Sequence, residues 1–98
     1  MAFIQTMEFT TDNTDQMLAL ARKWHDDASG TGTAQGATLV EDDSTPGRYV
    51  MAVSFESAEA AAENSNRPET GAFADEFRSL CSDGPEYREF DLVTVFDA

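Results

Sequence analysis

The order in which strand-like and helix-like segments follow one another restricts the fold of this chain more than any other feature. Three segments alternate apolar and polar residues with the period of a strand, a short fourth strand forms a hairpin with one of them, and the rest favours helices. The predicted elements are a strand at 3–10, a helix at 14–28, strands at 37–41 and 48–55, a helix in two pieces between 58 and 80, and a strand at 87–96. This order predicts a ferredoxin-like βαββαβ fold of the α+β class, with a four-stranded antiparallel sheet and two helices on one face.

Apolar residues occupy both faces of the predicted sheet. In the first strand Ile4 lies opposite Phe3 and Met7. The apolar residues expected on the face without helices are Val50, Ala52, Val93 and Val95, or their alternate partners. An exposed apolar area of this extent marks an interaction surface, so we expect a homodimer in which two sheets face each other.

The connections are indicated by residues that favour turns. Residues 29–36 hold three of the six glycines and predict a connecting loop that could act as a lid. Turns are expected at 42–47 and at 82–85. Ser57 is a good N-cap for the helix that follows, and Pro68 must break that helix because proline disfavours helical geometry at the preceding residue.

Composition limits the partners and the compartment. The 98 residues suffice for one domain, which we expect to span 1–98. With a net charge of −13 the chain would repel phosphate backbones and anionic lipids, so nucleic-acid and membrane partners are disfavoured. The chain has no signal-peptide pattern and a single cysteine, which agrees with a reducing, cytoplasmic location. One histidine and one cysteine fall short of a transition-metal site, and no metal is expected.

The segment 48–70 reads Arg-Tyr-Val-Met-Ala-Val-Ser-Phe, then an alanine-rich helix, then Asn-Ser-Asn-Arg-Pro-Glu-Thr. With the element order it resembles the dimeric α+β barrel superfamily, in particular the small proteins similar to antibiotic biosynthesis monooxygenases. The resemblance covers essentially the whole chain and implies a pocket for a small, mostly apolar or aromatic molecule, with no cofactor. Haem-degrading members use an Asn on the first strand, a Trp on a middle strand and a His on the second helix. Here the first strand has Gln5 instead of an Asn, the third strand has no Trp and the second helix has no His. Haem degradation is therefore not predicted.

Two residues are candidates for catalysis. His25 has the side chain whose ordinary pKa lies nearest neutrality and could act as a base, or it could simply lie on the polar edge of the first helix. Tyr49 begins a strand and could present its hydroxyl to a pocket. If His25 is buried beside a cavity with a fixed partner, catalysis is favoured, whereas an exposed His25 argues against it.

Five further residues are candidates for ligand binding. Trp24 and Tyr87 could line a pocket, although core packing is the alternative for Trp24. Asn64, Asn66 and Arg67 surround the helix break, where they could contact a ligand at the pocket mouth or only cap the next helix. Two functions therefore stay open: a cofactor-independent monooxygenase, and a non-catalytic small-ligand-binding or dimeric interaction protein.

Overall fold

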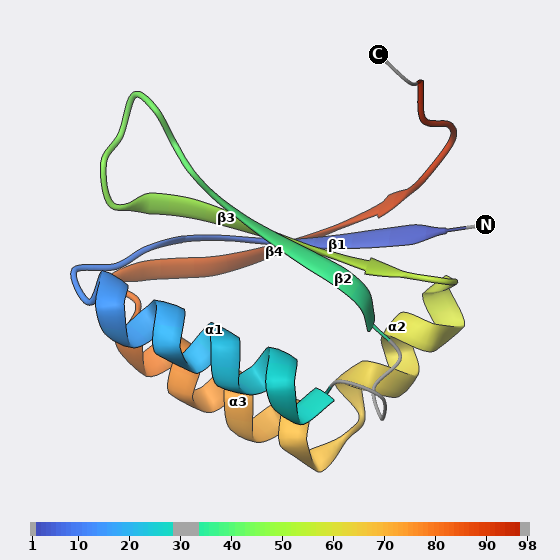
Figure 1. Cartoon of the computed structure of the whole chain (residues 1–98), viewed down its shortest axis with the longest axis horizontal. Coiled ribbons are helices and arrows are strands. Elements are labelled where there is room, and N and C mark those ends of the chain that lie inside the picture. Colours follow the sequence, from blue (N-terminus) through green and yellow to red (C-terminus); the bar gives the residue numbers. More distant parts are fainter. Residues whose placement is uncertain (1, 29–33, 97–98) are drawn as a thin grey trace.

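The computed structural model describes residues 2–28 and 34–96, and it has the predicted α+β architecture (Figure 1). Its elements are β1 (Phe3–Thr10), α1 (Thr14–Ala28), β2 (Ala34–Glu41), β3 (Arg48–Phe55), α2 (Ala58–Ser65), α3 (Pro68–Leu80) and β4 (Asp83–Asp91). The strands form one antiparallel sheet in the order β2-β3-β1-β4. All three helices lie on one face of this sheet, and the other face carries no layer (Figure 1). The ferredoxin-like prediction is confirmed.

Strand register decides which residues enter the core. β1 pairs with β3 so that Phe3 lies beside Phe55 and Met7 lies beside Met51. Since side chains alternate between faces, this register brings the larger apolar residues of both strands to the helix side. The buried apolar residues are Phe3, Met7, Phe9, Met17, Met51, Val53, Phe55, Ala61 and Phe77.

A chain of aromatic rings ties the helices to the sheet. The Trp24 ring lies 5.3 Å from that of Phe73, which lies 5.5 Å from Phe77. Phe77 meets Phe9 edge to face at 4.6 Å, and Phe9 stacks on Tyr49 at 5.6 Å between ring centroids. Such pairs stabilise a fold by about 0.5–1.5 kcal/mol each beyond their burial. They fix the spacing between α1, α3 and the two central strands.

The helix break at Pro68 is confirmed. Ser57 caps α2, and its Oγ accepts a hydrogen bond from the Ala60 amide at 3.1 Å. After Ser65 the backbone leaves helical geometry, with Arg67 extended at φ −78° and ψ 138°. Pro68 then occupies the first position of α3, where its missing amide hydrogen is not needed.

The predicted start of β2 was too late. Ala34 and Gly36 belong to the strand, where they pair with Phe55 and Ser54 across a register shift. The glycine-rich composition of residues 29–36 favours a loop, but at Ala34 and Gly36 the pairing with β3 outweighs that local preference. Residues 29–33 of the predicted loop and lid lie outside the described part of the chain.

The predicted bounds of the last strand were also wrong at both ends. β4 already pairs at Asp83 with Thr10, so the predicted turn at 82–85 is largely strand. The strand ends at Asp91, opposite Phe3 at the start of β1, and the Leu92 amide still donates a hydrogen bond to the Ala2 carbonyl at 2.9 Å. Val93 and Val95 therefore do not lie on the sheet. They belong to an extended segment, residues 92–96, that turns away from the sheet on the helix-free side (Figure 1).

No helix in the described ranges is long and apolar enough to cross a membrane.

The predicted turn at 42–47 is confirmed. Gly47 has a φ of +89° there, which residues with a side chain rarely adopt.

Candidate functional site

A partly open pocket of about 190 Å³, called the interior cavity below, lies between the helix side of the sheet and the helices. Its walls are mostly apolar, and Val53 and Phe55 of β3 face Phe73 of α3 across it. Trp24 of α1 closes one side. Ligand pockets commonly combine apolar walls of this kind with a few polar groups, so the cavity is the candidate functional site.

Asn64 supplies the most unusual polar group of the cavity. Its side chain lines the cavity near the end of α2 and is only 4% exposed. The amide oxygen Oδ1 has no hydrogen-bond partner among the described residues. A buried oxygen without a donor destabilises a fold by about 1–3 kcal/mol, and most buried polar groups have a partner. The cavity therefore holds one buried acceptor that could receive a hydrogen bond from a bound molecule.

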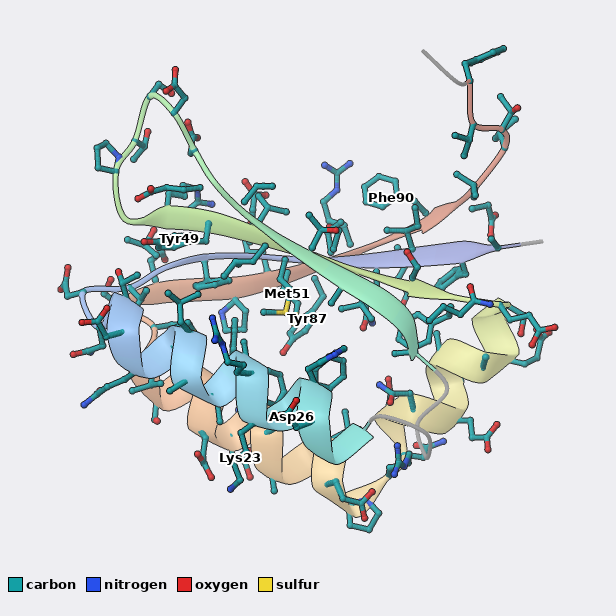
Figure 2. The ribbon with its side chains drawn as sticks, viewed as in Figure 1. Lys23, Asp26, Tyr49, Met51, Tyr87 and Phe90 are labelled. Atoms are coloured by element: carbon teal, nitrogen blue, oxygen red, sulfur yellow. The ribbon has the colours of Figure 1, made fainter. Side chains whose placement is uncertain are left out.

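Four further polar side chains line the cavity, those of Gln5, Ser65, Thr70 and Tyr87. Gln5 comes from β1, and Tyr87 comes from the edge strand β4, where it is 48% exposed. Figure 2 shows Tyr87 and Met51 pointing from the sheet toward the helices, whereas Phe90 points to the opposite side. Tyr87 therefore stands where the cavity approaches solvent.

A groove of about 230 Å³ runs along the outer side of the cavity, between α1 and α3. Lys23 and Arg67 line it together with Glu69 and Glu76, so its charges nearly balance. Arg67 forms an ion pair with Glu69 at 3.0 Å. Asn66 is exposed at the end of α2 and lines neither the groove nor the cavity.

The two candidate catalytic residues lie away from the cavity. His25 is exposed and borders a separate hollow between α1 and β2. Tyr49 lies at the other end of the core, where its hydroxyl shares a hydrogen bond with the Thr14 hydroxyl at 3.1 Å. The exposed position of His25 is the geometry that argues against a role as base.

The structure thus brings together three of the seven predicted site residues, namely Trp24, Asn64 and Tyr87. Gln5 and Thr70 also line the cavity but were not predicted. Gln5 could have been predicted, because it is a polar residue on the same strand face as the apolar residues Phe3 and Met7. Thr70 carries no comparable signal.

The cavity offers binding groups rather than acid–base groups. Among the described residues that line it, none is an Asp, Glu or His. In the described ranges no cluster of three His, Cys, Asp or Glu side chains could hold a metal ion. The Cys81 thiol lies at the end of α3, and burial raises its pKa, so it is a poor nucleophile at neutral pH.

Comparison with solved structures confirms the predicted resemblance at the level of the fold. SnoaB, a cofactor-independent oxygenase from Streptomyces nogalater, superimposes with a TM-score of 0.84 at 13% identity, covering 99% of this chain and 98% of that one. A candidate antibiotic biosynthesis monooxygenase from Caulobacter crescentus gives 0.83 at 9% identity, covering 95% and 91%. A similar protein from Nitrosomonas europaea gives 0.80 at 11% identity, covering 94% and 90%.

Sequence comparison adds nothing to this similarity. No family model matches the chain, and no curated protein matches it. The chain therefore shares the fold of these proteins, and the identities are too low to transfer an activity.

Proposed function

We propose that this chain binds a small hydroxylated aromatic molecule in the interior cavity and oxygenates it without a cofactor. The observation that carries the proposal is the buried, unpartnered Oδ1 of Asn64 at the wall of a mostly apolar cavity. A phenolic hydroxyl donates one hydrogen bond and leaves an apolar ring beside it, which is the combination this wall requires.

The size of the cavity limits the ligand. An engineered apolar cavity of about 150 Å³ in another protein holds benzene. A cavity of about 190 Å³ is slightly larger, so a ligand of one or two fused rings fits it. Phe55, Phe73 and Trp24 supply aromatic surface against which such rings pack.

The oxygenation is supported by the fold shared with a cofactor-independent oxygenase. The substrate would be a phenol that also carries an activated ring CH₂. This carbon loses a proton and then gives electrons to dioxygen. One oxygen atom forms the new C=O bond, the O–O bond breaks, and the second oxygen leaves as water with the two hydrogens. The protein's part is to bind, orient and shield the ionised substrate, because the described residues of the lining include no carboxylate or imidazole.

A pair of ligands tests the binding. We expect calorimetry to give at least tenfold tighter binding of 2-naphthol than of 2-methoxynaphthalene, which has the same rings but no hydroxyl donor, since an unfilled buried acceptor is worth about 1–3 kcal/mol. Equal affinities would overturn the proposed site. Oxygen uptake with 8-hydroxy-2-tetralone, in the presence of a chelator, then tests the reaction. Binding without uptake would favour the alternative, a non-catalytic ligand-binding protein.

We expect His25→Ala to change kcat/KM for that substrate by less than about twofold, because the imidazole is exposed and lies outside the cavity. A positioned general base contributes about 10²–10⁴-fold. In wild type and in His25→Ala alike, the rate of oxygen uptake should therefore depend on pH as the ionisation of the substrate does, which pH profiles measure. A hundredfold loss in the variant would instead identify His25 as the base.

The helix-free face supports a second part of the proposal, a homodimer. Ile4, Val50 and Ala52 lie on this face, together with Val40 at 52% and Phe90 at 40% exposure. The neighbouring segment 92–96 leaves Val93, Val95 and Phe96 from 69% to 88% exposed on the same side. Two copies meeting face to face would cover both sets of apolar residues.

We expect Ala52→Asp to convert a dimer to a monomer in sedimentation at micromolar concentration, because each interface would then contain two uncompensated carboxylates near its centre. Ala52 lies between Thr6 and Thr38 on neighbouring strands. Leu18→Asp is the matched control, since Leu18 is 42% exposed on the helix side and should leave the dimer intact. A wild-type protein that sediments as a monomer would refute the dimer.

A further inference from the structure

Trp24 occupies an unusual position among the described residues, because its side chain borders three hollows at once. It lines the interior cavity, the outer groove between α1 and α3, and the hollow between α1 and β2. Phe73 and Thr70 are shared by the cavity and the outer groove. The cavity and the groove are therefore neighbours with a common wall.

The aromatic part of this wall is a pair of rings from the two facing helices. The rings of Trp24 and Phe73 lie 5.3 Å apart between centroids with an interplanar angle of 32°. At this distance aromatic rings are in contact. No ligand ring can lie between them, so the pair separates the cavity from the groove.

Trp24 packs against the edge of the core rather than inside it. Met17 is 2% exposed and anchors the helix in the core, whereas Trp24 is only partly buried. A tryptophan packed on all sides would border no free space. Trp24 borders it on several sides, which distinguishes it from the fully buried residues of the core.

We propose that Trp24 is a specificity-determining residue that limits the length of the ligand. This inference rests on the proposed function. The indole forms part of the wall between the cavity of about 190 Å³ and the groove of about 230 Å³, and its removal would join the two. The apolar residues Leu20 and Ala72 of the groove would then receive an additional ring. Wild-type protein accepts two fused rings, and a protein without the indole accepts three.

The test compares 2-naphthol with 2-hydroxyanthracene, which adds one fused ring to the same phenol. Calorimetry measures the ratio of the two affinities in wild type, Trp24→Ala and Trp24→Phe. A ratio is used because a general loosening of the fold weakens both ligands together. We expect Trp24→Ala to shift the ratio at least tenfold toward the three-ring ligand, and Trp24→Phe to shift it less.

Leu20→Ala is the matched control for lost packing on α1. Leu20 lines the outer groove and not the cavity, so its truncation widens the groove without opening the wall. We expect it to leave the ratio within about twofold of the wild-type value. Where Trp24→Ala does not fold, Trp24→Leu replaces it in the same measurement.

An unchanged ratio in the Trp24 variants would overturn the inference, as would an equal shift in Leu20→Ala. The proposed function is tested separately by the preference of wild type for 2-naphthol over 2-methoxynaphthalene. If that preference is present and the ratio does not shift, only the role of Trp24 fails. If wild type binds none of these ligands, both proposals fail.

Discussion

Gly84→Ala is expected to lower the free energy of unfolding by about 2–4 kcal/mol. Gly84 has a φ of +86°, which residues with a side chain rarely adopt. A Cβ built there would lie 2.6 Å from the Glu8 carbonyl oxygen and 3.2 Å from the Phe9 Cα. Both backbone strain and steric overlap therefore oppose the substitution.

The neighbouring backbone cannot easily move away. Glu8 and Phe9 belong to β1, where they pair with Val50 and Tyr49 of β3 on the other side. Gly84 lies at the irregularity between β1 and β4, where the pairing register shifts. A shift of β1 to make room would disturb the central pair of strands, and Phe9 is fully buried. The strain must instead be taken up by the edge strand, which weakens its pairing.

Urea unfolding followed by circular dichroism measures this effect. All variants are compared at one protein concentration, since a dimer's stability depends on it. Gly36→Ala is the matched control, because a Cβ at Gly36 meets nothing within 4 Å and Gly36 has no positive φ. We expect that control to change stability by less than about 1 kcal/mol. Equal losses in the two variants would contradict the role assigned to Gly84.

Asn64→Leu is expected to move stability and ligand binding in opposite directions. Leucine has a similar size and shape, so it fills the space without the buried, unpartnered oxygen. We expect the free energy of unfolding to rise by about 1 kcal/mol, since replacing an unsatisfied polar group by an apolar one removes its desolvation penalty. The affinity for 2-naphthol should fall at least tenfold, because the hydroxyl of the ligand loses its acceptor.

The matched control is the same substitution two residues away. Asn66 is exposed at the end of α2 and does not line the cavity. Asn66→Leu should leave the affinity for 2-naphthol unchanged and alter stability by no more than about 0.5 kcal/mol, as surface substitutions usually do. If Asn64→Leu lost several kcal/mol of stability with unchanged binding, Asn64 would be a structural residue and the proposed site would be wrong.

Local physical rules were sufficient for the element order and for the central strands. The bounds of β1, α1 and β3 are those predicted, because the spacing of their apolar residues is set by which face enters the core. The break between α2 and α3 is also local, since Pro68 disfavours helical geometry at Arg67 whatever surrounds it.

The ends of β2 and β4 depend on their pairing with neighbouring strands. β2 includes Gly36, and β4 includes Gly84 and Pro85, although each of these residues favours a turn. β3 pairs with Gly36 at Ser54, and β1 pairs with β4 on both sides of Gly84 and Pro85, at Asp83 and at Glu86. β4 ends at Asp91, opposite Phe3 at the start of β1, and one further hydrogen bond joins the Leu92 amide to the Ala2 carbonyl.

The candidate site likewise combines features that local patterns predict with features that depend on the tertiary structure. Local patterns were enough to predict the sheet with helices on one face, the polar helix break and the position of Asn64 beside that break. They could not determine that Asn64 and Tyr87 line one cavity while His25 and Tyr49 lie outside it. Periodicity defines the face of an element to which a side chain belongs, whereas a cavity depends on how two elements are spaced and rotated against each other. Here the contacts among Trp24, Phe73 and Phe77 set that spacing, and they exist only in the folded chain.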